Sequence, residues 1–159
     1  MGMLAAVITV SDRSAAGLRA DASGPVAAEL LRAAGFDVGE ATVVPDGADS
    51  VEQALRAAIG AGARLVVTTG GTGLSPRDET PEGTARVLER AVPGIAEELR
   101  RIGAAAKPAG MLSRGLSGIA GGALIVNLAG SPHAVASGMP VVLSVAWHVI
   151  DQLSGGDHP

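Results

Sequence analysis

The hydrophobic residues of this chain are grouped in short continuous runs, separated by stretches with helical spacing. Three runs contain β-branched residues and little polar alternation, which predicts strands buried on both faces. They are M-L-A-A-V-I-T-V at 3–10, L-V-V-T-T at 65–69 and A-L-I-V-N-L at 123–128. Residues 36–44 alternate between apolar and polar positions, which predicts a fourth strand.

Apolar residues at intervals of three or four positions predict helices between and after the strands. These helix signals cover 23–34, 48–60, 80–91, 93–102 and 139–153, whereas 103–110 predict a loop. The order of strands and helices predicts the α/β class. We expect a single three-layer α/β/α domain over residues 1–159, with a mainly parallel sheet and a frayed tail from about residue 154.

The segment after the strand at 65–69 has the strongest functional pattern. It contains a glycine loop, then Thr80 as the predicted N-cap and Pro81 at the first helical position. Glycines let a ligand approach the backbone, and a helix start attracts anions, most often phosphate. The loop alone could equally be a tight turn, since it matches neither common nucleotide-binding glycine motif. Its residues are Gly70, Gly71, Thr72 and Gly73.

Polar residues or glycines also follow the other predicted strands, and these are Ser11, Asp12, Asp46, Asn127, Gly130 and Ser131. Ser131 is a predicted N-cap before Pro132, so it begins a second helix start suited to anions. The two aspartates could equally be turn residues. Because the carboxyl ends of parallel strands meet at one edge of a sheet, we expect these groups to lie together there.

The composition narrows the classes of function. The chain has 159 residues with one Phe, one Trp and no Tyr, so aromatic platforms that stack single-stranded nucleic acid are missing. Its net charge of −4 also argues against a nucleic-acid groove. It has no cysteine, which excludes disulfides and thiolate catalysis.

The start of the chain has no basic segment typical of a signal peptide. No apolar run approaches the roughly 20 residues that span a bilayer. We therefore expect a cytoplasmic protein with no membrane and no nucleic-acid partner.

The residues available for chemistry favour phosphate transfer over hydrolysis. The three histidines lie in the C-terminal part without metal-ligand spacing, and no Ser/His/Asp arrangement is evident, so zinc hydrolysis and acyl transfer fit poorly. Two helix starts suited to phosphate, together with several carboxylates, fit two phosphorylated groups and Mg²⁺. Phosphoryl-type transfer then needs positioning and charge neutralisation more than a strong base.

The motifs together resemble a known family. G-G-T-G followed by R-D and T-P is similar to the signature of the molybdenum-cofactor biosynthesis domain, found in bacterial molybdopterin adenylyltransferases, MoaB-like paralogues, and plant and animal cofactor-assembly proteins. S-D-R at 11–13, P-D at 45–46, L-S-R at 112–114 and N-L-x-G-S-P at 127–132 extend the resemblance over nearly the whole chain. The chain departs from the family pattern at Ala129, where the family has proline, and at His133, where many members have lysine.

The resemblance implies Mg²⁺-dependent transfer of AMP from ATP to the terminal phosphate of molybdopterin. It implies that Asp46 and Asp78 are catalytic and hold or orient Mg²⁺ and the attacking phosphate. Arg77 either neutralises phosphate charge or pairs with a nearby carboxylate, and Arg114 either faces an anion or is a surface arginine. The expected substrate-binding and phosphate-binding residues are Ser11, Asp12, Gly70, Gly71, Thr72, Gly73, Arg77, Ser113, Arg114, Asn127, Gly130 and Ser131.

The resemblance also implies a homotrimer and contacts with other cofactor-assembly proteins. An alternative is a non-catalytic MoaB-like protein that binds molybdopterin as a scaffold. A third interpretation, a nucleotide-binding α/β protein outside this family, would require the matches in several segments to be chance.

Overall fold

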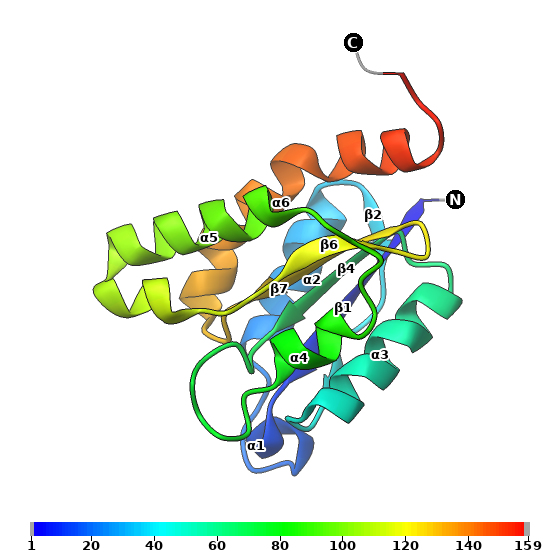
Figure 1. Cartoon of the computed structure of the whole chain (residues 1–159). Coiled ribbons are helices and arrows are strands. Elements are labelled where there is room, and N and C mark those ends of the chain that lie inside the picture. Colours follow the sequence, from blue (N-terminus) through cyan, green and yellow to red (C-terminus); the bar gives the residue numbers. More distant parts are fainter. Residues whose placement is uncertain (1, 158–159) are drawn as a thin grey trace.

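A computed structural model describes residues 2–157 and shows one central sheet with helices on both faces (Figure 1). The sheet has seven strands in the order β2-β1-β4-β7-β6-β5, and β3 pairs with a second stretch of β1. The prediction of a three-layer α/β fold with a mainly parallel sheet is confirmed.

The three central strands are β1 (Met3–Val10), β4 (Leu65–Thr69) and β7 (Ala123–Leu128), and all three predictions are confirmed. They pair in parallel, so that Thr69 lies between Thr9 and Leu128 where the strands end. Every residue of β4 and β7 is buried, as expected for strands with helices on both sides.

Alternate residues of these strands face two separate hydrophobic clusters. On one face, Leu65 and Val67 pack in the cluster formed with α2 (Ser23–Ala33), α5 (Pro93–Ala106) and α6 (Pro132–Leu153). On the other face, Val66 and Ile125 pack with α3 (Ala48–Gly60) and with Val87, which follows α4 (Thr80–Ala85). The period of two along each strand thus separates the two layers.

The predicted strand at 36–44 is interrupted. It forms β2 (Phe36–Val38) and β3 (Thr42–Val44), which pair with successive parts of β1. Between the pairs Ala5↔Val38 and Ile8↔Thr42, β1 advances three residues and its partner four, so this edge has one extra residue, as in a bulge. Arg32 of α2 donates hydrogen bonds to the carbonyls of Val38 and Gly39 in this interruption.

The predicted helix at 80–91 is wrong in its second half. Helix α4 ends at Ala85, and β5 (Arg90–Ala91) pairs antiparallel with β6 (Ser117–Ala120), a strand that the hydrophobic pattern missed. β6 returns through the Gly121-Gly122 turn to pair antiparallel with β7. A strand of two residues is too short to show a period, so only its partner determines it.

The predicted loop at 103–110 is also wrong. Helix α5 continues to Ala106, and the 3₁₀ helix η1 (Pro108–Leu112) folds back along it. A side chain on Gly110 would overlap the backbone of Gly103, so glycine permits this close return. A short helix, α1 (Asp12–Ala15), follows β1 directly.

The last helix is longer than its apolar spacing suggested. α6 begins at Pro132 and includes Pro140, and its 22-residue length and apolar composition would be enough to cross a bilayer, a property that buried core helices share. In the structure its side chains Val135, Met139 and Val142 are fully buried in the core. Residues 154–156 donate hydrogen bonds to its last turn, and His158 and Pro159 of the predicted tail lie outside the described residues.

Replacing Gly70 with alanine should lower the free energy of unfolding by about 1–3 kcal/mol, because the left-handed backbone is strained for other residues and the new Cβ would overlap the carbonyl of Val10. Urea unfolding followed by circular dichroism measures this. Gly39→Ala is the matched control, since nothing lies within 4 Å of a Cβ there. Equal losses in both variants would contradict the close approach at Gly70.

Candidate functional site

The expected site residues do meet at the carboxyl ends of the central strands. The N–H of Gly70 after β4 donates to the carbonyl of Leu128 in β7 at 3.0 Å, and the N–H of Ser11 after β1 donates to the carbonyl of Val44 in β3 at 2.9 Å. A Cβ on Gly130 would lie 3.0 Å from the Cα of Gly70, so the backbones of these two glycines are close together. These contacts bring four chain segments to one edge of the sheet.

The glycine loop is shaped by positive φ angles at Gly70 (94°) and Gly71 (67°). The side chain of Thr80 returns to this loop, because its hydroxyl donates to the carbonyl of Gly70 and its N–H donates to the carbonyl of Gly71. The prediction of Thr80 as the N-cap of α4 is therefore wrong. Glu79 occupies the N-cap position, and Thr80 is the first helical residue. The loop and the start of α4 form one unit.

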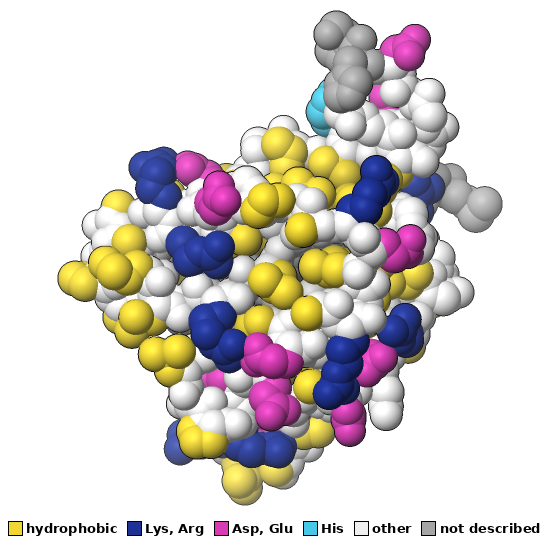
Figure 2. Space-filling model, in the orientation of Figure 1, with side chains coloured by type: hydrophobic (Ala, Val, Ile, Leu, Met, Phe, Trp, Pro, Cys, Tyr) yellow, Lys and Arg dark blue, Asp and Glu magenta, His cyan; other side chains and the backbone are white. Residues whose placement is uncertain are grey.

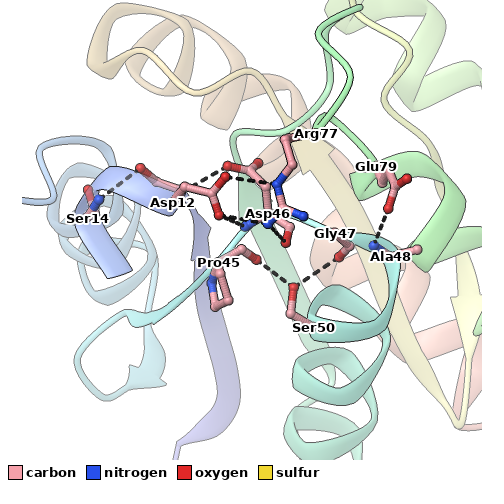
Figure 3. A network of polar contacts seen from close by, with 10 residues as sticks. Asp12, Ser14, Pro45, Asp46, Gly47, Ala48, Ser50, Arg77 and Glu79 are labelled. Carbon is pink, nitrogen blue, oxygen red and sulfur yellow. Dashed lines mark hydrogen bonds and ion pairs between the residues drawn. The ribbon is translucent and has the colours of Figure 1, made fainter. Parts of the chain in front are cut away.

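On one side of the loop lies a network formed by Asp12, Asp46 and Arg77 (Figure 3). The two aspartates exchange hydrogen bonds, from the N–H of Asp12 to Oδ2 of Asp46 at 2.9 Å and from the N–H of Asp46 to Oδ1 of Asp12 at 3.1 Å. Arg77 donates to both carboxylate oxygens of Asp12 and to the carbonyl of Asp46. Of the two predictions for Arg77, the structure shows the pairing with a carboxylate.

The network sets the pKa values of its two aspartates apart. The hydrogen bond from Arg77 lowers the pKa of the partly exposed Asp12 below its usual value. Partial burial raises the pKa of Asp46, a hydrogen bond from Asp12 lowers it, and the negative charges of Asp12 and Asp78 raise it further. The charge of Asp46 is therefore less compensated than that of Asp12, which suits a carboxylate that receives a cation.

Asp78 lies beside the glycine loop. Its Oδ2 accepts a hydrogen bond from the N–H of Ser75 at 3.2 Å, and a Cβ on Gly73 would be 2.9 Å from the same oxygen. A Cβ on Gly71 would similarly be 3.2 Å from Oδ1 of Asp46. Each of the two predicted catalytic carboxylates thus has an oxygen next to a glycine of the loop.

Several predicted ligand-binding side chains contact protein groups instead. Asn127 is buried, and its amide donates to the hydroxyls of Thr68 and Thr84 and accepts from the N–H of Leu116. Ser11 caps α1, and Ser131 caps α6 as predicted, by accepting from the N–H of Ala134. These residues shape the edge, and their binding roles stay predictions.

On the other side of the loop lies a groove of about 940 Å³, within the usual range for ligand sites. It is bounded by the loop, α5, η1 and the start of α6, and its walls include Thr72, Gly73, Ser113, Asn127 and Ser131. Figure 2 shows hydrophobic side chains gathered where α5 meets η1, in agreement with the exposed Met111 and Leu112.

The charged residues of the groove are basic. Among the described residues its lining contains Arg100, Lys107 and His133 and no acidic side chain. No motif in the sequence pointed to Arg100 or Lys107, because the spacing of apolar residues at 93–102 indicates a helix and does not identify which polar side chains line a groove. Arg100 donates to the carbonyl of Gly115 at 2.8 Å, across the groove wall. The close Gly103–Gly110 return builds this wall, and helical periodicity contains no signal for it.

Comparison with known proteins identifies the family and the fold of this chain. Residues 6–148 match the model of a family described as a probable molybdopterin binding domain. A molybdenum cofactor biosynthesis bifunctional protein of Synechococcus elongatus is 40% identical over 157 residues, 99% of this chain and 49% of that protein. A molybdopterin adenylyltransferase of Escherichia coli K12 is 34% identical over 148 residues, 91% of this chain and 75% of that protein. The chain spans about half the length of the bifunctional relative.

Solved structures show the same fold. The molybdopterin biosynthesis Mog protein of Mycobacterium ulcerans has a TM-score of 0.90 and 44% identity, and the alignment covers 98% of this chain and 99% of that chain. The molybdopterin biosynthesis enzyme MoaB of Thermus thermophilus has a TM-score of 0.88 and 38% identity, with 98% of each chain covered.

Replacing Arg77 with glutamine should raise the pKa of Asp12, because it removes the hydrogen bond that lowers this pKa most. The pKa of Asp46 should rise further, since the charge of Arg77 lowers it. Carboxyl ¹³C NMR titration measures both values. Arg101→Gln, which removes an exposed arginine paired with Glu98, is the control and should change neither.

Arg77→Gln should also lower the free energy of unfolding, by an amount that depends on pH. The pKa of Asp12 is lower in the folded protein, so its pairing with Arg77 stabilises the fold above the unfolded pKa and is lost as pH falls through the folded pKa. The difference in stability between wild type and Arg77→Gln should therefore shrink in acid. An unchanged pKa of Asp12 in this variant would contradict the network.

Proposed function

The chain belongs to the family of molybdopterin-binding domains, and from this premise we propose that it is a molybdopterin adenylyltransferase in molybdenum cofactor biosynthesis. The observation that carries the proposal is the division of one sheet edge by the glycine loop. A basic groove lies on one side of the loop, and a carboxylate network lies on the other. A reaction that joins two phosphorylated molecules needs two such adjoining places.

The groove suits molybdopterin, which has a ring system and a terminal phosphate. Apolar residues such as Leu99 and Leu112 would contact the ring, and Lys107 and His133 would attract the phosphate. The start of α6 lies in the same wall, and the positive end of its dipole favours an anion.

The carboxylate side suits the triphosphate of ATP together with Mg²⁺. Within residues 2–157 no group of three or more His, Cys, Asp or Glu side chains could enclose a metal ion. Mg²⁺ is commonly held by one or two carboxylates plus phosphate oxygens and water, so Asp46 and Asp78 fit it. When bound there, Mg²⁺ would neutralise charge on the phosphates.

In the proposed reaction an oxygen of the terminal phosphate of molybdopterin attacks the α-phosphorus of ATP. A new phosphorus–oxygen bond forms, the bond between the α-phosphorus and the bridging oxygen breaks, and pyrophosphate leaves. The attacking group is already ionised, so the protein needs no strong base. The glycine loop lies between both ligands and would position the attacking phosphate close to the α-phosphate.

The two departures from the family pattern both fall in the groove, where Ala129 and His133 form part of the lining. Alanine leaves the turn before α6 less rigid than proline would. Histidine places an imidazole ring where many family members have the flexible ammonium group of lysine. Both changes act on ligand affinity, and neither removes a carboxylate.

The non-catalytic alternative is a MoaB-like protein that binds molybdopterin without transferring AMP. The pair of carboxylates beside the loop supports the enzyme, because a scaffold that only binds an anion would gain nothing from negative charge there. A homotrimer and contacts with other cofactor-assembly proteins stay predictions from the resemblance, and a cytoplasmic location stays a prediction from the sequence.

The direct test is to mix the protein with molybdopterin, ATP and Mg²⁺ and to measure adenylyl-molybdopterin and pyrophosphate. Asp78→Asn should lower turnover by on the order of 10²-fold, because it removes a charge that acts on the reacting phosphates, and should leave molybdopterin binding nearly unchanged. Asp37→Asn is the control, since Asp37 is exposed in β2, beside the start of β1 and far from the site edge.

Binding of molybdopterin without any product would support the scaffold. Loss of binding in Asp78→Asn, with turnover per bound complex intact, would contradict the catalytic role of this carboxylate.

A further inference from the structure

Arg114 is predicted from the family motif to bind substrate phosphate, but its guanidinium is directed at the glycine loop. Its Nε donates to the carbonyl of Gly73 at 2.9 Å, and its Nη2 donates to the carbonyl of Asp78 at 2.7 Å. Its own backbone N–H donates to the carbonyl of Thr72 at 2.9 Å. Arg114 thus contacts the glycine loop at two points and Asp78, which follows it, at a third.

The two carbonyls bound by the guanidinium belong to Gly73 and Asp78, which flank the exposed residues 74–77. Asp78, at the end of this segment, bonds back to Ser75 within it. The N–H of Asp78 donates to the carbonyl of Ser75, and the carboxylate of Asp78 accepts from the N–H of Ser75. The segment therefore closes on itself, and Arg114 joins its ends. The direction of the Asp78 side chain depends on this closure.

Glu82, in the first turn of α4, holds the guanidinium in place. Nη1 of Arg114 lies 2.7 Å from Oε2 and 3.1 Å from Oε1 of Glu82, and this pairing raises the pKa of the arginine. A planar guanidinium can reach two carbonyls and a carboxylate at once, whereas an ammonium group is a single point of charge.

We propose that Arg114 is a positioning residue, which clamps residues 73–78 and thereby aims the carboxylate of Asp78, without itself contacting substrate phosphate. It corresponds to Arg77 on the opposite side of the loop, which joins the loop to Asp12 and Asp46. Each of the two carboxylates is then oriented by its own arginine. The catalytic consequence rests on the proposed function, but the clamp itself does not.

The first measurement is hydrogen–deuterium exchange across residues 72–80 in the protein without substrates. Arg114→Lys should raise exchange in this segment by about 10-fold, because a single ammonium cannot hold both carbonyls and Glu82. Arg101→Lys is the matched control, since it alters an arginine–glutamate pair on the exposed face of α5. Unchanged exchange in Arg114→Lys would overturn the clamp, whether or not the protein is an enzyme.

The second measurement is kinetic. Arg114→Lys should lower kcat by about 10- to 100-fold and raise the Mg²⁺ concentration for half-maximal rate, as expected when a supporting contact of a metal-orienting carboxylate is lost. The dissociation constant of molybdopterin should stay within about 2-fold, because no substrate contact is removed. In an Asp78→Asn background the same change should have little further effect on kcat.

The outcomes separate the two proposals. Weaker molybdopterin binding with normal exchange would show that Arg114 binds phosphate, which overturns the positioning role. If exchange is faster in Arg114→Lys while the wild-type protein itself forms no adenylyl-molybdopterin, the clamp is supported and the adenylyltransferase is refuted. If Arg114→Lys does not fold, Glu82→Gln carries the test, and it should raise exchange in the same segment by a smaller factor.

Discussion

The close approach of Gly70 to the carbonyl of Val10 is the contact on which the rest of the site depends. It lets the end of β4 lie against the end of β1, while the N–H of Gly70 joins the end of β7. A side chain at this position would push these strand ends apart. Because the central strands end together, the loop that follows β4 lies between the carboxylates after β1 and β3 and the helix start after β7.

The site separates charge across this loop. The lining of the groove is apolar and basic among the described residues, whereas the opposite side holds Asp12 and Asp46, with Asp78 at the loop itself. Arg77 and Arg114 both lie close to this boundary, and both pair with carboxylates and carbonyls of the protein. These contacts join the loop to the acidic side chains around it.

Sequence patterns predicted the central elements well and the peripheral ones poorly. β1, β4 and β7 are buried on both faces, so their hydrophobic runs were unambiguous. β5 and β6 were missed because they are short and antiparallel, and β5 exists only through its pairing with β6. The return of η1 along α5 was missed because it depends on a close backbone contact between Gly103 and Gly110, and glycines contribute no side chain to a hydrophobic pattern.

The sequence by itself determined the layer arrangement, the sheet edge at which the functional groups meet and the family, because burial patterns and short motifs are local properties of the chain. Only the tertiary structure decided what each side chain contacts. Arg77 pairs with Asp12, Arg114 bonds carbonyls of the loop segment, and the amide of Asn127 bonds three protein groups, whereas the motifs alone had left the partners of both arginines open. The reason is that these partners lie between 11 and 65 positions away in the chain, so no local pattern records them.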